Sequence, residues 1–203
     1  MGVTKKIKSY FKRSSSNKEK ILVTGGLGYI GSHTVVELIE AGYVIFIVDN
    51  LSNSSIDVLK GIEKITGVKP VYENIDCTDY VAMNKFLSKN EGIRAIIHFA
   101  ASKAVGESVE KPLMYYRNNI VSLLNILELM PIHKIDGIVF SSSCTVYGQP
   151  EVLPVTESAP LQKALSPYGN TKQICEDIIN DTVSANPNVK SIVLRYFNPI
   201  GAH

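Results

Sequence analysis

The hydrophobic positions of the chain fall into short apolar runs separated by longer amphipathic stretches. Six runs are rich in Ile and Val and lack strict alternation, which is typical of strands buried on both faces of a sheet. We expect strands at 21–24, 44–48, 71–73, 95–99, 137–141 and 191–196. Between them, apolar residues at helical spacing predict helices at about 28–41, 55–66, 79–89, 112–130 and 168–185.

This regular order of strand, helix and strand predicts the fold class. A helical crossover between consecutive strands lets them pair in parallel, and such crossovers are right-handed. We therefore expect residues 20–203 to form one α/β domain with a doubly wound parallel sheet, the Rossmann fold.

Residues 1–19 differ in composition from the rest and are expected to form a disordered basic tail. Residues 1–20 carry seven basic side chains and one acid, whereas residues 21–203 carry 14 basic and 18 acidic side chains. Because the body is mildly acidic, nucleic acid is not expected as a partner. The alternative for the tail is a basic amphipathic helix on an anionic membrane. Such a helix would bury only Ile7, Tyr10 and Phe11.

The sequence also indicates in which cellular compartment the protein is expected. No apolar stretch reaches the roughly 20 residues of a membrane-spanning helix, and the first residues lack the apolar core of a secretion signal. Gly2 hints at myristoylation, but Lys6 stands where that motif has Ser or Thr. Cys77, Cys144 and Cys175 are widely spaced and odd in number, which favours reduced thiols over disulfides or zinc ligands. We expect a cytoplasmic protein with no stable membrane anchor and no metal.

The first expected strand runs directly into a glycine-rich turn, in which Gly25, Gly28 and Gly31 form the pattern G-x-x-G-x-x-G. Gly25 suits the tight turn out of the strand, Gly28 leaves room for a diphosphate, and Gly31 lets helix and strand pack closely. The N-terminus of the following helix offers free N–H groups and a positive dipole end to an anion. The turn therefore predicts a dinucleotide site.

An acid follows at the end of the second expected strand. Asp49 lies 18 residues beyond Gly31, where a carboxylate accepts hydrogen bonds from ribose hydroxyls and repels a 2′-phosphate. Taken alone, Asp49 is equally well explained as a turn residue. Together with the glycines it favours NAD over NADP as the cofactor.

Tyr168 and Lys172 form a Y-x-x-x-K motif at the start of the last expected helix, on one helix face. Pro167 suits the first turn of that helix. Tyrosine is a poor base at neutral pH because its pKa is about 10, but a nearby ammonium or a positive nicotinamide ring favours the phenolate. Such pairs also arise by chance on exposed helices. The order of glycine turn, strand-end serine and Y-x-x-x-K is what favours catalysis.

A third catalytic group is expected beyond the carboxyl end of the strand at 137–141, because ligands of open α/β sheets bind there. Ser143 is our candidate for steadying the reacting hydroxyl, and Ser142 is its main competitor. The predicted catalytic residues are thus Ser143, Tyr168 and Lys172.

Longer strings extend this pattern over residues 20–203. They are TGGLGYIGSH (24–33), DNLSNS (49–54), HFAASKAVGES (98–108), YYRNN (115–119), SSSCTVYG (141–148) and LRYFNPIGAH (194–203). With them the chain resembles the extended short-chain dehydrogenase/reductase family, and within it the UDP-sugar epimerases. The strings around Lys103 and at the C-terminal end are the more specific ones.

The resemblance implies a wider set of site residues. Contacts with NAD are implied for Tyr29, Ile30, Asp49, Asn50, Asn53, Ser54, Asp76, Cys77, Phe99, Ala100, Lys103 and Asn118, beside Gly25, Gly28, Gly31, Ser143, Tyr168 and Lys172. Contacts with a UDP-sugar are implied for Lys103, Ser143, Tyr168 and Asn198. Without the matching strings, we would interpret Lys103 as a solvated loop residue and Asn118 as a residue that caps a local turn.

The resemblance also implies a reaction. Tyr168 would take the proton of the sugar 4-hydroxyl as the C4 hydride moves to NAD, and its return to the opposite face would interconvert UDP-galactose and UDP-glucose. Two other functions stay open: a non-catalytic NAD-binding remnant, and an epimerase of another UDP-sugar. A dehydratase would carry an acid after the strand-end serine, where this chain has Cys144 and Thr145.

Members of the family continue into a smaller C-terminal domain that grips the uridine and phosphates. We expect that domain to be missing from this chain and the Rossmann domain to be truncated. Family members pair through two long helices, which correspond to 112–130 and 168–185 here, so a homodimer is possible.

Overall fold

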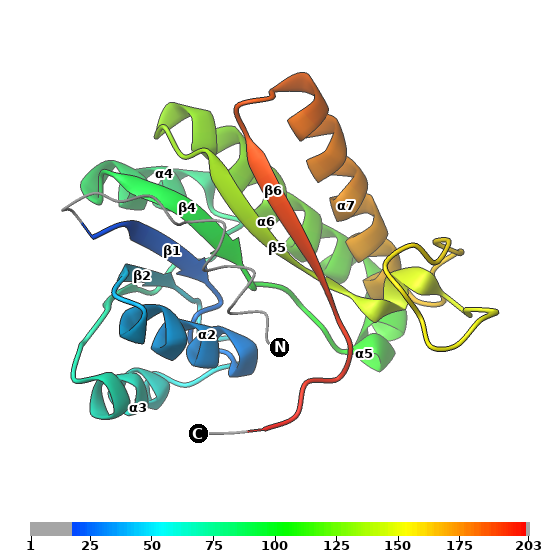
Figure 1. The fold of residues 1–203 in the computed structure, drawn as a ribbon, viewed down its shortest axis with the longest axis horizontal. Coiled ribbons are helices and arrows are strands. Elements are labelled where there is room, and N and C mark those ends of the chain that lie inside the picture. Colours follow the sequence, from blue (N-terminus) through cyan, green and yellow to red (C-terminus); the bar gives the residue numbers. More distant parts are fainter. Residues whose placement is uncertain (1–17, 202–203) are drawn as a thin grey trace.

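A computed structural model describes residues 18–201, and within them six strands form one parallel sheet (Figure 1). The strands are β1 (Lys20–Thr24), β2 (Val44–Val48), β3 (Val71–Glu73), β4 (Ile93–His98), β5 (Gly137–Ser143) and β6 (Lys190–Tyr196). Their order is β3-β2-β1-β4-β5-β6, and every neighbouring pair is parallel. The predicted doubly wound sheet is confirmed, with its switch point between β1 and β4.

Helices cover both faces of the sheet (Figure 1). One face carries α2 (Tyr29–Glu40) and α3 (Asp57–Thr66), and the other carries α4 (Tyr80–Lys89), α6 (Pro112–Ile132) and α7 (Pro167–Ala185). Two shorter elements, α5 (Val105–Glu110) and the 3₁₀ helix η1 (Cys144–Tyr147), follow the carboxyl ends of β4 and β5. Both faces of the central strands are therefore shielded from solvent.

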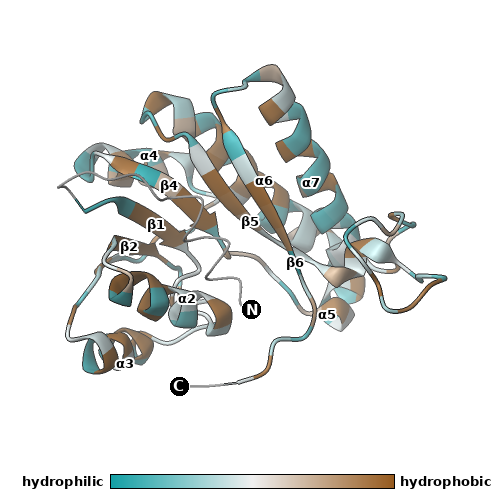
Figure 2. Cartoon of the chain, viewed as in Figure 1, coloured by the Kyte–Doolittle hydropathy of each residue, from teal (hydrophilic) through white to brown (hydrophobic). Residues whose placement is uncertain are grey.

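The core consists of two apolar layers, one on each side of the sheet. Along β1, the side chains of Ile21 and Val23 pack toward α2 and α3, whereas Leu22 packs toward α4 and α6. Successive side chains of a strand point to opposite faces, so a strand covered on both sides needs apolar residues at every position. This explains the continuous runs of Ile and Val. In Figure 2 the central strands are accordingly coloured mostly as hydrophobic.

The boundaries of the predicted elements agree with the observed ones to within two residues, and those of β2 and β3 are identical. Two starts are fixed by side-chain caps: Asp79 accepts a hydrogen bond from the N–H of Ala82 before α4, and Ser166 accepts one from the N–H of Gly169 before α7. The elements α5 and η1 were not predicted, because six and four residues are too short for a helical period to stand out. The expected tail at 1–19 lies almost wholly outside the described residues, as does His203.

Among residues 18–201, no helix combines the length and the apolar character needed to cross a membrane.

The packing of α4 gives a direct test of the core. Phe86 is buried on α4 and meets Phe46 of β2 edge to face, with ring centroids 6.5 Å apart. We expect Phe86→Ala to lower the free energy of unfolding by about 3–5 kcal/mol, since it removes a buried ring and leaves a cavity. Val81 lies on the same helix at 75% exposure, so Val81→Ala is the control, with a change within about 0.5 kcal/mol. Urea denaturation measures both, and equal losses would contradict this account of the core.

Candidate active site

The glycine turn after β1 is shaped by backbone packing. Gly25 has a φ of +67°, and a Cβ there would lie 2.7 Å from the backbone nitrogen of Ala100. A Cβ on Gly31 would lie 2.2 Å from the carbonyl oxygen of Gly25. Both contacts are with backbone atoms that cannot move aside, so the turn and the first turn of α2 require glycine at these positions.

The N-terminus of α2 has the properties of an anion site. Gly28 occupies the N-cap position, no side chain caps the helix, and its first turn contains no acid. The first N–H groups of a helix have no intrahelical acceptor and carry the positive end of the dipole. These groups border the cavity described below, so the residues present fit a bound diphosphate.

Asp49 ties this turn to the end of β2. One carboxylate oxygen accepts from the N–H of Leu27 at 3.0 Å, and the other accepts from Leu51 N–H at 3.0 Å and Ser54 Oγ at 2.8 Å. A carboxylate offers about four acceptor positions, so about one remains for a ribose hydroxyl. Asp49 therefore organises the turn and also lines the cavity, so the turn role and the ribose role considered from the sequence are compatible.

Asp76 lies near Asp49 in the same cavity wall. Burial by itself would raise the pKa of Asp76, but hydrogen bonds from Thr78 and Asn50 outweigh it and lower the pKa overall. Thr78 donates through its N–H at 2.8 Å and its Oγ1 at 2.7 Å, and Asn50 Nδ2 donates at 3.1 Å. This end of the cavity is thus anionic, which disfavours an added phosphate on an adenosine ribose.

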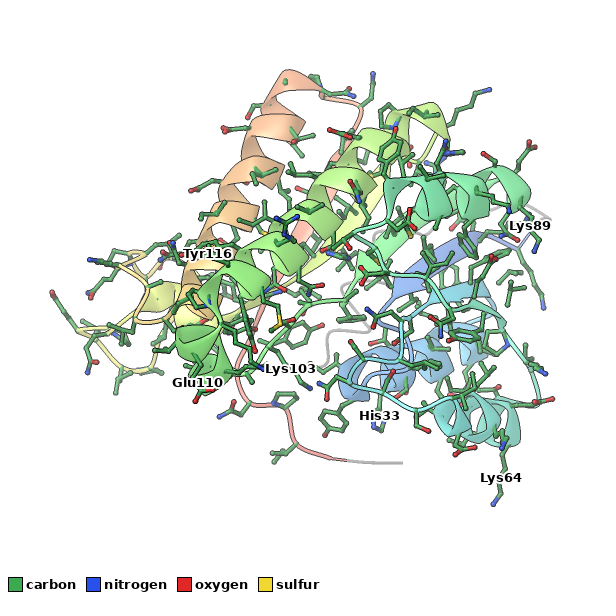
Figure 3. The ribbon with its side chains drawn as sticks, turned by 180° about the vertical axis from the view of Figure 1, so that it is seen from behind. His33, Lys64, Lys89, Lys103, Glu110 and Tyr116 are labelled. Atoms are coloured by element: carbon green, nitrogen blue, oxygen red, sulfur yellow. The ribbon has the colours of Figure 1, made fainter. Side chains whose placement is uncertain are left out.

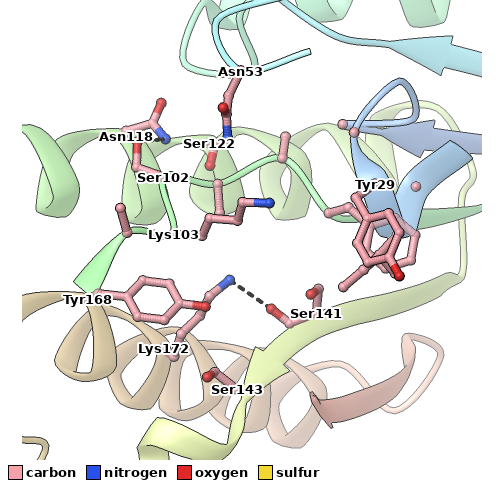
Figure 4. Close-up of a pocket in the computed structure, with 18 of the residues that line it drawn as sticks. Tyr29, Asn53, Ser102, Lys103, Asn118, Ser122, Ser141, Ser143, Tyr168 and Lys172 are labelled. Atoms are coloured by element: carbon pink, nitrogen blue, oxygen red, sulfur yellow. Dashed lines mark hydrogen bonds between the residues drawn. The ribbon is translucent and has the colours of Figure 1, made fainter. Parts of the chain in front are cut away.

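The two candidate serines of β5 lie on opposite sides of the strand. Ser142 Oγ donates to the buried carboxylate of Glu176, away from Tyr168. Ser143 Oγ accepts from Thr145 N–H at 3.2 Å and lies on the side of Tyr168, where it acts to lower the pKa of the phenol. The geometry therefore favours Ser143 over Ser142 as the partner of the phenol (Figure 4).

Tyr168 is held in its protonated form. Burial raises the pKa of Tyr168, the hydrogen bond with Ser143 acts in the opposite direction, and the pKa stays above its ordinary value. Lys172 Nζ lies 5.8 Å from the centroid of the phenol ring. Among the groups of this chain, burial therefore has the largest effect on the pKa of Tyr168.

Lys172 is one of the buried charged side chains. Its Nζ donates to the carbonyl oxygen of Ser141 at 2.7 Å and lies 4.7 Å from the ring centroid of Phe140 (Figure 4). Burial lowers the pKa of Lys172 to about 8, although Cys175 and Glu176 favour the ammonium. The lysine is thus poised between its two protonation states near neutral pH.

The loop after β4 is fastened to α6 and α7 by amide side chains. Asn119 Oδ1 accepts from the N–H of Ser102 at 2.8 Å, and its Nδ2 donates to Ser102 O at 3.0 Å and Thr171 Oγ1 at 3.1 Å. Asn118 Nδ2 donates to Ser102 Oγ at 3.1 Å. The next residue in the loop, Lys103, lies between α5 and α2 (Figure 3). Asn119 was missed as a site residue, although it stands in the string YYRNN.

These groups surround one cavity of about 910 Å³ above the carboxyl ends of the strands. Every glycine, polar and apolar residue that we assigned to the cofactor, the substrate or catalysis lines it, including Asn198 of the segment after β6. Tyr29 Oη donates to the carbonyl oxygen of Gly201, which brings that segment to α2 at the cavity edge. The structure thus brings together residues separated by up to 173 positions in the sequence.

Several cavity residues were not singled out from the sequence. Tyr115 donates to Glu107 at 2.9 Å, accepts from Ala104 N–H at 3.0 Å, and meets Tyr168 edge-on at a centroid distance of 6.5 Å. Thr145 Oγ1 is, within residues 18–201, the buried side-chain polar atom without a hydrogen-bond partner. An unpaired buried hydroxyl is costly, so it suits a site that receives a polar ligand. Tyr115 and Thr145 lie in the strings YYRNN and SSSCTVYG. The family resemblance of these strings was therefore the signal that could have identified both residues.

In the described part of the chain, no group of three or more His, Cys, Asp or Glu side chains could hold a metal ion. Cys77, Cys144 and Cys175 are free thiols.

Comparison with known proteins gives consistent matches. The model of the NAD dependent epimerase/dehydratase family matches residues 21–203. The UDP-glucose 4-epimerase of Dictyostelium discoideum is 51% identical over 185 residues, which cover 91% of this chain and 53% of that protein. The UDP-glucose 4-epimerase of Mus musculus is 47% identical over 191 residues, with coverages of 91% and 55%.

A solved structure shows the same similarity as the sequence relatives. A UDP-glucose 4-epimerase from Bifidobacterium longum, crystallised with NAD⁺ and UDP, superposes with a TM-score of 0.88 at 45% identity, covering 91% of this chain and 55% of that one. This chain therefore spans about half the length of the curated relatives it matches.

The close packing at Gly31 gives a stability test. We expect Gly31→Ala to lower the free energy of unfolding by about 2 kcal/mol or more, because its methyl group would overlap a backbone carbonyl. Gly61 is the matched control, since it lies inside α3 with open space around it. Gly61→Ala should raise the same free energy by about 0.5–1 kcal/mol through helix propensity. Chemical denaturation measures both; a neutral Gly31→Ala would rule out the tight approach.

The buried ammonium gives a pH test. Because the pKa of Lys172 falls from 10.5 to about 8 on folding, the unfolded chain binds more protons between these values. Stability relative to Lys172→Met should therefore rise with pH across this window, by up to roughly 3 kcal/mol. Guanidinium denaturation from pH 7 to pH 10.5 compares the two proteins. Parallel stability curves would show that Lys172 is not desolvated.

Proposed function

Because the chain belongs to the NAD dependent epimerase/dehydratase family, we propose that it binds NAD across this cavity and supplies the proton-transfer residues of a UDP-sugar 4-epimerase. The observation that carries the proposal is the meeting of Ser143, Tyr168 and Lys172 in the same cavity as the uncapped N-terminus of α2. Phosphate binding at one end and a proton-transfer group at the other is the arrangement that nicotinamide chemistry needs.

The cavity residues divide into three parts with respect to NAD. The first turn of α2 would hold the diphosphate, and Asp49 with Asp76 would face the adenosine ribose and exclude a 2′-phosphate. Lys172 would lie at the nicotinamide ribose. NAD, when bound, supplies the acceptor and donor of hydride. The remaining assigned contacts, such as Asn53 and Phe99, line the walls between these points.

The proton chemistry belongs to this chain. Ser143 Oγ would hydrogen-bond the reacting 4-hydroxyl, and Tyr168 Oη would take its proton and later return it. The raised pKa of Tyr168 keeps its proton in place until positive charge enters the cavity. The buried ammonium of Lys172 would then stabilise the phenolate.

The substrate we propose is the pair UDP-galactose and UDP-glucose. Its support is the activity of the relatives from Dictyostelium discoideum and Mus musculus described above, both of which are UDP-glucose 4-epimerases. Within the chain, Lys103 offers a cation for a diphosphate, and Asn198 and the unpaired Thr145 hydroxyl offer polar contacts for a sugar.

We also propose a cytoplasmic location and a homodimer. The three free thiols favour a reducing compartment. One outer face of α6 carries the exposed Leu113 and Leu124 among charged residues, so pairing through α6 and α7 would cover apolar surface. Sedimentation equilibrium tests the dimer, and a monomer at every concentration would contradict it.

The decisive experiment separates cofactor binding from turnover. The purified chain should bind NAD, raising its melting temperature, and should convert UDP-galactose to UDP-glucose. Binding without conversion would support a non-catalytic NAD-binding protein instead. Absence of NAD binding would overturn the whole proposal.

Tyr168→Phe tests the proton step. The variant should keep NAD affinity within about threefold and lose turnover by roughly 10²–10⁴-fold, since only the acid/base hydroxyl is removed. Tyr116→Phe is the control: it removes a phenol hydroxyl that accepts from Asn170 Nδ2 at 2.7 Å outside the cavity, and it should turn over normally. Equal rates for the two variants would exclude the tyrosine mechanism.

A further inference from the structure

One buried acid has no part in the site described so far. Among residues 18–201, the buried Asp, Glu, Lys and Arg side chains are Asp49, Lys172 and Glu176. Asp49 and Lys172 line the cavity, but Glu176 does not. A buried carboxylate is costly unless it is paired and hydrogen-bonded, so its partners show what it holds in place.

The partners of Glu176 come from two other elements, β5 and β6. Arg195 of β6 donates from Nε to Oε1 at 3.0 Å and from Nη2 to Oε2 at 2.7 Å, a two-point pairing. The same guanidinium donates from Nη1 to Tyr147 Oη of η1 at 3.0 Å. Ser142 of β5 donates to Oε1 of Glu176. One carboxylate on α7 is thus linked to β5, to β6 and, through Arg195, to η1.

Glu176 also lies in line with the catalytic side chains of its helix. Tyr168, Lys172 and Glu176 are spaced four residues apart, so they form a row along one helix face with a rise of about 6 Å per step. Three consecutive residues of β5 meet this row. Ser143 faces Tyr168, the carbonyl of Ser141 accepts from Lys172, and Ser142 donates to Glu176 (Figure 4).

From this geometry we propose that Glu176, clamped by Arg195 and Ser142, is a positioning residue that fixes the rotation and height of α7 against β5. The proposal rests on the function proposed above, because what it positions is Tyr168 opposite Ser143. Beside this clamp, α7 packs through apolar side chains such as Ile179 and through single hydrogen bonds such as that from Asn119 to Thr171. Apolar packing has no direction and tolerates small slides, whereas a two-point guanidinium–carboxylate pair has one geometry. The charge of Glu176 also favours the ammonium of Lys172 against its burial.

The first test uses hydrogen–deuterium exchange on the full chain without added ligand, read by mass spectrometry. In Glu176→Gln, amides of residues 167–180 should exchange about tenfold faster, while those of β1 and β4 stay within about twofold of the unchanged chain. Uniform acceleration would reveal only a stabilising ion pair, and no acceleration would reveal no clamp. Either result overturns the proposal.

Two further variants keep the test decisive. Arg195→Lys retains a cation but loses the planar fork, so it should give the same regional pattern even if Glu176→Gln does not fold. Asp136→Asn is the matched control, because it removes an acid from an exposed ion pair with Arg94 at the amino end of β5. Its exchange pattern should match that of the unchanged chain.

The second test uses the chain loaded with NAD. In Glu176→Gln, kcat for UDP-galactose should fall tenfold or more with KM and NAD affinity within about twofold, since small misplacements of reacting groups cost up to about 10²-fold. A fall in NAD affinity that matches the fall in kcat would overturn the positioning role. If the unchanged chain fails to bind NAD or to turn over sugar, the proposed function fails, and the exchange experiment still decides whether Glu176 clamps the helix.

Discussion

The parallel pairing of β1 with β4 is the constraint on which the rest of this structure depends. The chain builds outward from β1 through β2 to β3 and then returns to the other side of β1. The loops that leave the carboxyl ends of β1 and β4 therefore diverge onto opposite faces of the sheet. The cavity opens between them, and the backbone of Ala100 approaches Gly25 so closely that a side chain would not fit.

Buried hydrogen bonds then give the cavity its fixed walls. Asp49 joins the end of β2 to the glycine turn, Asn119 joins the loop after β4 to α6 and α7, and Glu176 joins α7 to β5 and β6. Each of these side chains connects segments that apolar packing alone would leave free to slide. Such buried polar links are directional, and leaving one unmade is expensive, so they specify a single arrangement of the loops.

Burial also shifts the pKa values of the two titratable side chains of the site, Tyr168 and Lys172. Desolvation raises the pKa of Tyr168 and lowers the pKa of Lys172, so both side chains favour their neutral forms more than they would in water. A positive ligand charge beside the phenol would reverse the first of these shifts. The groups of this chain alone therefore leave the proton on the tyrosine.

The sequence by itself determined the sheet class, the glycine turn, the acid after β2 and the Y-x-x-x-K helix, because each is a local pattern with a local physical cause. Buried strands need unbroken apolar runs, and a four-residue spacing faces one side of any helix. Only the tertiary structure decided which serine meets Tyr168, that Asp49 joins the glycine turn to the loop after β2, and that Glu176 pairs with Arg195. Those choices depend on the order of strands and the rotation of α7, which bring together residues that no spacing along the chain connects.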